Sequence, residues 1–202
     1  MAEYYPLKIQ CGTLSDPSFN HPGNGLVYPV NAVACDSHGL TRDLHSLYKF
    51  AKVYAGRRRL YHLARAITHD RDTPGTIVIE RAEKCESSPH LIAMVVQYAW
   101  GPPIEENELS RSIMKTTLDC HYAQGLKDDT KVNRMEYFKT CVKKLTIFAM
   151  GCPDLERLII PAGIGIEGGV HQDWKDNYIP ILQGMASRLQ SVGVEVVILE
   201  NK

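Results

Sequence analysis

The chain has 202 residues, of which 44% are hydrophobic, and this is enough to bury the core of one large domain. Basic and acidic residues number 23 each, so net charge draws the protein neither to nucleic acid nor to an anionic membrane. The six cysteines form no CxxC pair, and "MAEYYPLKIQ" resembles neither a signal peptide nor a transit peptide. We therefore expect reduced thiols and a soluble protein of the cytosol or nucleus, with no membrane contact.

The first half of the chain predicts strands that alternate with helices. Residues 5–12, "YPLKIQCG", are rich in β-formers, and the apolar start of "GLVYPVNAVACDSHG" is typical of a buried central strand. Apolar residues from Leu40 to Tyr48 recur at helical spacing. The basic stretch "GRRRLYHLARAITHDRD" predicts an exposed helix that ends before Pro74 and Gly75.

The second half continues the alternation. "GTIVIERA" and "HLIAMVVQYAWG" predict two strands, the second of them central, and residues 102–131 predict a polar insertion with one helix. Helical periodicity in "NRMEYFKTCVKKLTIFAMG" precedes the strand "LERLIIPAG". A last helix ends at Gly193 and holds Pro180 in its first turns or at a kink, and the strand "VEVVIL" follows it. This order predicts an α/β sheet with helices on both faces.

Two loops leave the ends of predicted strands and lead into helices. They are "NAVACDSHGL" and "PAGIGIEGGVHQDW". Ligands of open α/β sheets bind beyond the carboxyl ends of strands, where helix N-termini and bare amides favour a diphosphate. The alternative is that the glycines only supply turns with positive φ. The spacing fits neither GxGxxG with an acidic ribose partner nor the phosphate loop, so dehydrogenase and kinase functions are not supported.

Several segments in order resemble a known family. "GTLSD", "GLVYPVNAVACDSHGLTRDLHSLYK", "HLIAMVVQY", "NRMEYFKTCVKKL" and "LIIPAGIGIEGGVHQDW" are similar to the motifs of macrodomains, which bind ADP-ribose or hydrolyse ADP-ribosyl linkages. The closest branch has a second loop of the type "IGCGLAGGDW". The resemblance implies a three-layer α/β/α fold with a central mixed sheet, formed by a single domain over residues 1–202.

The resemblance also implies the residues of the ligand site. Asn31 would orient the distal ribose, the first loop would lie along the ribose and diphosphate, and the amides of the second loop would hold the diphosphate. The implied ligand-binding residues are Asn31, Ala32, Ala34, Cys35, Ser37, Gly39, Gln97, Gly163, Ile164, Gly165, Ile166, Gly168, Gly169 and Val170. Tyr98 or Trp100 would flank the adenine or the distal ribose.

The sequence departs from the family at three places. Thr13 stands where many relatives have an acidic residue that binds the adenine amine, a role that Asp16 is a candidate to supply. No lysine occurs in "HLIAMVVQY", so the covalent lysine mechanism of one subgroup lacks its nucleophile. Glu167 would repel a diphosphate, so either its side chain points away or the ligand differs.

Asp36 and His38 are the candidate catalytic residues. A carboxylate beside an imidazole can activate water against an anomeric carbon or a phosphate ester. The alternative is that Asp36 serves a turn or cap and His38 is solvated. For His171 and Asp173, capping and solvent exposure are the favoured interpretation.

Other reactive residue types carry no functional prediction. We expect Cys35 to be inert and Arg57, Arg58 and Arg59 to form a solvated face, far along the chain from both loops. The histidines show no zinc-ligand spacing with the cysteines, and we expect neither metal nor cofactor.

The sequence thus predicts binding of ADP-ribose or a related nucleotide in a cleft between the two loops. Hydrolysis of an ADP-ribosyl or phosphate linkage is an added possibility, with an ADP-ribosylated macromolecule as a further candidate partner. The alternative is a non-catalytic nucleotide sponge or interaction module with altered specificity.

Overall fold

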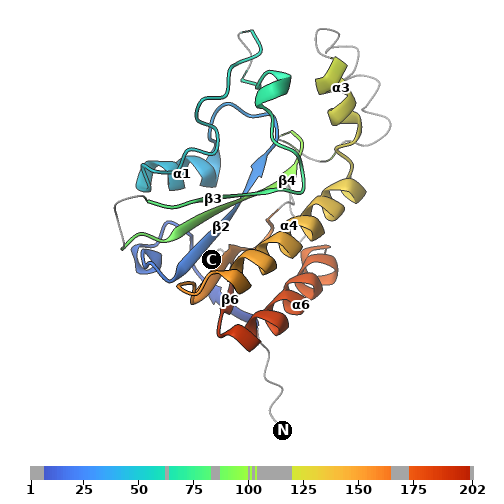
Figure 1. Cartoon of the computed structure of the whole chain (residues 1–202). Helices are drawn as coiled ribbons and strands as arrows, with labels where there is room; N and C mark the ends of the chain where they lie inside the picture. Colours follow the sequence, from blue (N-terminus) through green and yellow to red (C-terminus); the bar gives the residue numbers. More distant parts are fainter. Residues whose placement is uncertain are drawn as a thin grey trace.

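The structure is a computed structural model that describes residues 7–61, 64–82, 87–99, 101, 103, 120–164 and 173–200. Six strands form one sheet (Figure 1). They are β1 (Leu7–Cys11), β2 (Asn24–Asn31), β3 (Ile77–Glu80), β4 (His90–Gln97), β5 (Arg157–Pro161) and β6 (Glu195–Glu200). Their order is β1-β6-β5-β2-β4-β3, and every neighbouring pair is parallel except β3 with β4. The prediction of a mixed sheet is confirmed.

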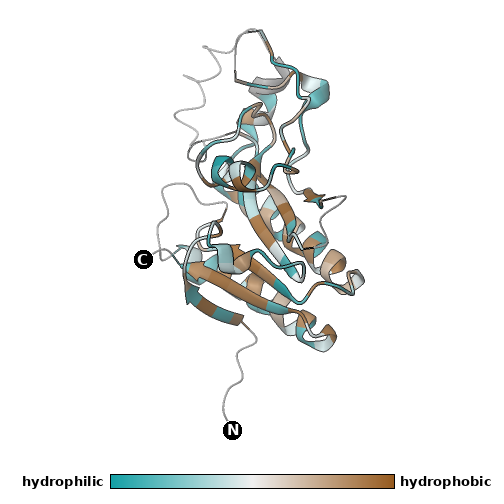
Figure 2. Cartoon of the chain, turned by 90° about the vertical axis from the view of Figure 1, so that its left-hand side faces the viewer, coloured by the Kyte–Doolittle hydropathy of each residue, from teal (hydrophilic) through white to brown (hydrophobic). Residues whose placement is uncertain are grey.

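Helices cover both faces of this sheet. α4 (Lys131–Gly151) and α6 (Ile179–Leu189) lie side by side on one face, and α1 (Gly39–Leu47) lies on the other (Figure 1). Each face has its own apolar core, and the strands between them are coloured mostly brown in Figure 2. The helices contribute residues such as Phe138 and Leu182 to one core and Leu44 to the other. The predicted three-layer α/β/α arrangement is therefore confirmed.

The central strands owe their position to continuous apolar sequence. Every residue of β4 is buried, and β2 is buried except at Pro29, which is half-buried. Strands covered on both faces lose the polar alternation of half-exposed strands, so the sequence "HLIAMVVQ" is suited only to the middle of the sheet. Full burial of a large aliphatic side chain stabilises a fold by about 1.5–3 kcal/mol, and β2 and β4 together bury many of them.

Local signals set the ends of the helices. Thr130 caps α4 by accepting a hydrogen bond from the Asn133 amide at 3.2 Å. A π-helical turn, Trp174–Tyr178, leads directly into α6, and Pro180 lies in the first turn of α6. A short 3₁₀ turn, Gln190–Val192, then ends at Gly193, whose φ of 78° is left-handed. These ends agree with the predicted positions of Pro180 and Gly193.

The predicted helix over residues 56–72 is wrong. Within its described residues, 56–61 and 64–72, the segment has a 3₁₀ turn at Thr68–Asp70 and otherwise forms an irregular hairpin with one bridge between Arg59 and Ala66. The Leu60 amide donates to the Arg65 carbonyl at 2.7 Å, and Tyr61 has a left-handed φ of 55°. The helical periodicity was misleading because the side chains of Arg57, Arg58 and Arg59 bond partners elsewhere in the chain, as described below. Tertiary contacts thus override local propensity.

The predicted insertion between Pro102 and Lys131 lies largely outside the described residues. Its described part includes α3 (Cys120–Lys127). A Cβ atom on Gly125 of α3 would lie 2.1 Å from the Tyr98 ring, so the helix approaches this ring as closely as a glycine allows. The contact joins α3 to the chain just after β4.

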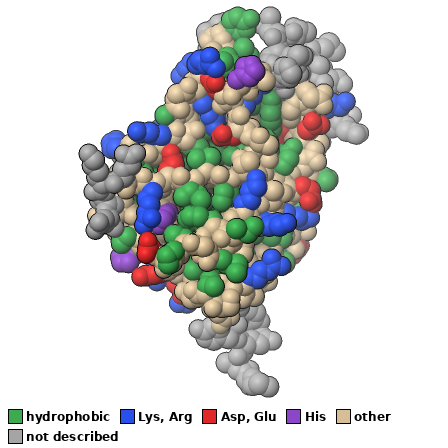
Figure 3. All heavy atoms as spheres, viewed as in Figure 1, with side chains coloured by type: hydrophobic (Ala, Val, Ile, Leu, Met, Phe, Trp, Pro, Cys, Tyr) green, Lys and Arg blue, Asp and Glu red, His purple; other side chains and the backbone are tan. Residues whose placement is uncertain are grey.

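Two surface properties bear on possible partners. Among the described residues, no helix is both long and apolar enough to cross a membrane. On the face seen in Figure 3, basic and acidic side chains are interspersed and do not gather in a patch of one sign. This distribution matches the equal numbers of basic and acidic residues in the sequence.

Candidate functional site

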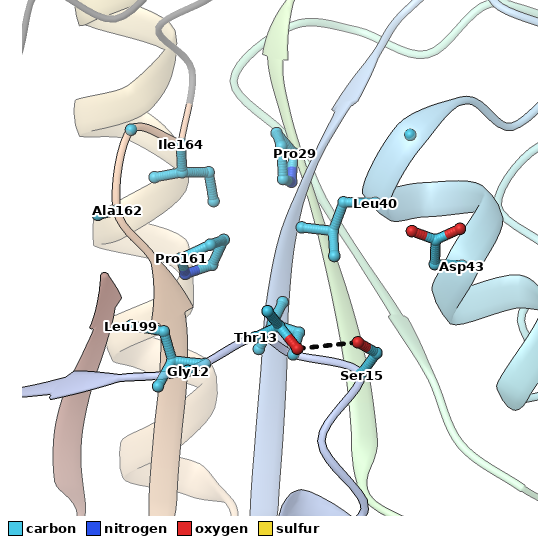
Figure 4. A pocket seen from close by; sticks show the side chains of 13 residues that line it. Gly12, Thr13, Ser15, Pro29, Leu40, Asp43, Pro161, Ala162, Ile164 and Leu199 are labelled. Atoms are coloured by element: carbon cyan, nitrogen blue, oxygen red, sulfur yellow. Dashed lines mark hydrogen bonds between the residues drawn. The ribbon is translucent and has the colours of Figure 1, made fainter. Parts of the chain in front are cut away.

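A cavity of about 320 Å³ lies at the carboxyl ends of β1, β5 and β6, beside the first turn of α1. Figure 4 shows that its walls come from segments far apart in the sequence. The described lining residues are Gly12, Thr13, Leu14, Ser15, Pro29, Gly39, Leu40, Asp43, Pro161, Ala162, Gly163, Ile164 and Leu199. These are the carboxyl ends of parallel strands, beyond which ligands bind in open α/β folds.

The lining separates into an apolar part and a polar part. Leu40, Pro29, Pro161, Ile164 and Leu199 present carbon atoms, whereas polar side chains come from the loop after β1 and from α1. These polar side chains are Thr13, Ser15 and Asp43. A flat ring with polar edges fits such a cavity, because small-molecule sites combine apolar walls with a few placed polar groups.

The loop after β1 is held by short-range hydrogen bonds. Its Gly12 amide donates to the Glu200 carbonyl at 3.1 Å, and the Thr13 and Ser15 hydroxyls are 2.9 Å apart. Asp16 accepts a hydrogen bond from the Ser18 amide at 2.9 Å, and this bond lowers the pKa of its carboxyl. Asp16 therefore caps the 3₁₀ turn Pro17–Phe19 and is not among the residues that line the cavity.

Asn31 holds the start of the first loop through hydrogen bonds to its side chain. Its side chain is buried, and Oδ1 accepts hydrogen bonds from the amides of Val33 at 3.2 Å and Ala34 at 2.7 Å. The carboxamide oxygen is thus used to turn the chain after β2. Ala32 and Ala34 are fully buried, and their predicted ligand contacts, like that of Asn31, stay predictions.

Arg57 supports the first loop from the side. Its side chain is only 6% exposed; it donates to the carbonyls of Ala32 at 3.1 Å and Ala34 at 2.7 Å, and it pairs with Asp72. The guanidinium also lies 4.7 Å from the centre of the Tyr54 ring. The prediction of a solvated face is wrong for Arg57, because this buried cation fixes two loop carbonyls.

Its two neighbours are exposed but also paired. Arg58 forms hydrogen bonds of 2.9 Å and 3.0 Å with Asp70, and Arg59 donates to Asp36 at 2.6 Å. Although the basic run is far along the chain from the first loop, Arg57 and Arg59 contact that loop, since the hairpin folds back onto it. The contact between Arg59 and Asp36 was not predicted because the two residues are 23 positions apart in the sequence.

The candidate catalytic residues lie beside the cavity and not in its described lining. Asp36 is half-exposed and paired with Arg59, while His38 is exposed and stands at the N-cap of α1 without a capping side-chain bond. Gly39, the next residue, does line the cavity. The neighbouring Cys35 is partly exposed, and burial raises the pKa of its thiol.

The second loop is described only where it leaves β5. Gly163 and Ile164 line the cavity, and the left-handed φ of 78° at Gly163 gives the turn that the glycine pattern predicts. The predicted ligand residues Gly165, Ile166, Gly168, Gly169 and Val170 lie outside the described residues, as do Glu167, His171 and Trp100.

Asp173 occupies the N-terminal position of the last helix but does not cap it. Its carboxylate accepts hydrogen bonds from Asn177 Nδ2 at 2.7 Å and pairs with Lys131 Nζ at 3.0 Å. The bond from Lys131 lowers the pKa of Asp173. The carboxylate therefore joins the last helix to the start of α4, and the predicted capping bond is not formed.

Gln97 belongs to a buried polar network behind the site. Its Oε1 lies 3.3 Å from Arg134 Nη1, and Arg134 pairs with Asp129 at 2.7 Å. Asp129 also accepts the amides of Tyr98 at 3.0 Å and Ala99 at 3.2 Å. The network holds the chain that follows β4, and the ligand contact predicted for Gln97 stays a prediction.

No group of three histidine, cysteine, aspartate or glutamate side chains is placed to hold a metal ion within the described residues. Tyr98 also has a partner within the protein, because its hydroxyl lies 3.2 Å from Arg71 Nη1.

The six-stranded mixed sheet, its helices on both faces and the cavity at the carboxyl ends define a three-layer α/β/α architecture. No protein-family model matches the sequence, and no curated protein matches it significantly. Solved structures, in contrast, match this chain over most of its length. The macrodomain of Mycobacterium tuberculosis DarG gives a TM-score of 0.56 at 15% identity and covers 96% of each chain.

Two other macrodomains agree. That of Thermus aquaticus DarG gives a TM-score of 0.52 at 16% identity, covering 96% of this chain and 97% of its own. A mutant of a macrodomain from Oceanobacillus iheyensis gives 0.54 at 15% identity, covering 97% of this chain and 84% of its own. The chain has the macrodomain fold.

Proposed function

We propose that this protein binds ADP-ribose, or a nucleotide derived from it, in the cavity between the loop after β1, the start of α1 and the exit of β5. One observation carries the proposal. The two glycine-bearing strand exits, although more than a hundred residues apart, meet at Gly39 and Gly163 around a single cavity. Their meeting was the condition on which the predicted cleft depended.

The size and chemistry of the cavity support a nucleotide. A volume of about 320 Å³ falls at the lower end of small-molecule sites, and its apolar walls suit a purine ring. α1 begins at the cavity with an N-cap that supplies no side-chain bond, so its first amides and its dipole favour an anion. A base and a phosphate group thus find matching surroundings at the same sheet edge.

Isothermal titration calorimetry with ADP-ribose tests the proposal. Leu40→Trp places an indole where Leu40 borders the cavity, and we expect affinity to fall about tenfold or more, which corresponds to about 1.4 kcal/mol. Leu47→Trp is the matched control, because Leu47 lies on the same helix, is 54% exposed and does not line the cavity. Absence of binding by the unaltered protein would refute the proposal.

Hydrolysis is a second candidate function. Its support is that Asp36 and His38 are accessible to solvent directly before Gly39 of the cavity. The Arg59 guanidinium bound to Asp36 favours the alternative of binding without catalysis. Single-turnover release of ADP-ribose from an ADP-ribosylated protein or nucleic acid tests this point: release that is absent, or that is unchanged in Asp36→Ala and His38→Ala, would remove the pair from any mechanism.

A further inference from the structure

A thiol and a buried imidazole meet at the end of the sheet opposite the cavity. Cys152 follows α4 as its C-cap, and His90 is the first residue of β4, against which α4 packs. Cys152 Sγ lies 4.0 Å from His90 Nε2, at the outer limit of a hydrogen bond that involves sulfur. Because β4 runs parallel to β2, and β2 to β5, the pair lies at the amino ends of these strands, whereas the cavity lies at the carboxyl ends.

The His90 ring is enclosed and keeps hydrogen-bonding capacity. The residue is 2% exposed, and its ring meets Phe148 edge-on with the centroids 5.8 Å apart. Its Nδ1 is buried and has no partner among the described residues. Burial, together with the nearby Arg81 cation, lowers the pKa of His90, while Asp154 acts in the opposite direction. The imidazole is therefore neutral near neutral pH, and a neutral ring has a nitrogen that can accept a proton.

Two other thiols face a different kind of partner. Cys141 Sγ lies 3.2 Å from the carbonyl oxygen of Thr76, and Cys35 Sγ lies 4.0 Å from that of Arg58. A carbonyl oxygen accepts a hydrogen bond but leaves the proton on sulfur, and burial raises the pKa of both thiols. Among the cysteine side chains that the structure describes, Cys152 alone has a histidine within hydrogen-bond reach.

We propose that Cys152 is a thiol-modification site, at which a small disulfide forms a mixed disulfide with His90 as the base. The proposal goes beyond nucleotide binding and does not depend on it. The Cys152 thiol gives its proton to His90 Nε2, and the sulfur attacks one sulfur of the disulfide. One S–S bond forms as the original one breaks, and the departing thiolate takes the proton from His90. The Cys152 sulfur is oxidised and the departing sulfur is reduced, so the disulfide is the only co-reactant.

The position of Cys152 makes the imidazole necessary. The carboxyl end of a helix carries partial negative charge, which disfavours a thiolate, whereas activated cysteines often lie at helix N-termini. α4 therefore does not activate Cys152, and the reaction depends on the proton being accepted by His90. Cys152 is partly exposed, so a small reagent can reach its sulfur.

The test treats the unaltered protein with glutathione disulfide and follows each cysteine by peptide mass spectrometry. Cys11 is exposed on β1 and serves as the reference within the same molecule. A positioned base typically speeds a proton-transfer step by about a hundredfold or more, and we expect Cys152 to react about tenfold faster than Cys11 because its contact with His90 is long. In His90→Phe, Cys152 should react no faster than Cys11.

His45→Phe is the matched control. His45 also has a buried nitrogen without a partner in the described part of the chain, and burial lowers its pKa. It lies on α1, on the opposite face of the sheet from α4, so its removal should leave the ratio of the two rates unchanged. Cys152→Ser should abolish the fast reaction and leave that of Cys11 as it was. Thermal unfolding checks that each variant is folded.

Two outcomes would overturn the proposal. One is a Cys152 rate equal to or below that of Cys11 in the unaltered protein, a comparison that needs no variant and holds even if His90→Phe does not fold. The other is a ratio in folded His90→Phe that equals the ratio in the unaltered protein, because Cys152 would then react without the imidazole.

Discussion

The guanidinium of Arg59 donates to the carboxylate of Asp36 at 2.6 Å, which joins the hairpin after α1 to the loop after β2. The two residues are 23 positions apart, and each side chain is about half exposed. The pair places the hairpin beside the loop that leads to Gly39 and the cavity. It also occupies one oxygen of the residue that sequence reasoning singles out as a water-activating group.

Removing this pair should change stability little. Solvent screens exposed ion pairs, which contribute about 0.2–1 kcal/mol, so Arg59→Ala should lower the free energy of unfolding by no more than about 1 kcal/mol. Urea denaturation of Arg59→Ala, Asp36→Ala and the double variant measures the coupling between the two residues. A coupling energy well above about 1 kcal/mol would show that the pair is more shielded than its exposure indicates.

The pair between Arg134 and Asp129 should behave in the opposite way. Its side chains are 2% and 1% exposed, and Asp129 also binds two backbone amides. Arg134→Ala leaves a buried carboxylate without its cation, and we expect a loss of about 3–5 kcal/mol in the free energy of unfolding. The control is Lys139→Ala, which breaks the exposed pair with Glu136 on the same helix. A loss in Arg134→Ala as small as in the control would contradict the prediction.

Asp70 should titrate at unusually low pH. Hydrogen bonds from Arg58 lower the pKa of its carboxyl from 3.8 to about 2. Because the folded-state pKa lies below the unfolded-state value, this carboxylate stabilises the hairpin above about pH 4 and loses that effect as pH falls toward 2. An NMR titration of the carboxyl carbon measures the midpoint. Arg58→Ala should return it toward 3.8, and a midpoint near 3.8 in the unaltered protein would contradict the assigned pairing.

The sheet was predictable from sequence because its strands carry their own signal. The fully buried β4 reads as an apolar run, and Gly193 ends the last helix with a left-handed φ. The segment 56–72 was not predictable in the same way. Its helical periodicity competes with bonds from Arg57, Arg58 and Arg59 to distant acceptors, and no local pattern reports those acceptors.

The site was predictable only where the backbone is constrained. Gly163 needs a left-handed φ, and Gly39 begins a helix after a strand exit. Both positions could therefore be identified from the glycine pattern of the sequence. Asp43 and Leu199 were missed because each is ordinary for its own helix or strand. They line the cavity only because separate elements meet there, a consequence of topology that no short motif encodes.

Arg57 gives the sharpest test of how the hairpin supports the first loop. Lysine keeps the charge but lacks the planar fork with which Arg57 reaches two carbonyls and Asp72 at once. In Arg57→Lys we expect faster hydrogen exchange at the Ala34 amide and weaker ADP-ribose binding, although Arg57 does not line the cavity. Arg58→Lys is the control, because the Arg58 side chain is 68% exposed and donates only to Asp70 among the described residues. If both lysine variants retain the exchange rate and the affinity of the unaltered protein, the loop holds its shape without Arg57, and the Asn31 carboxamide alone fixes the turn.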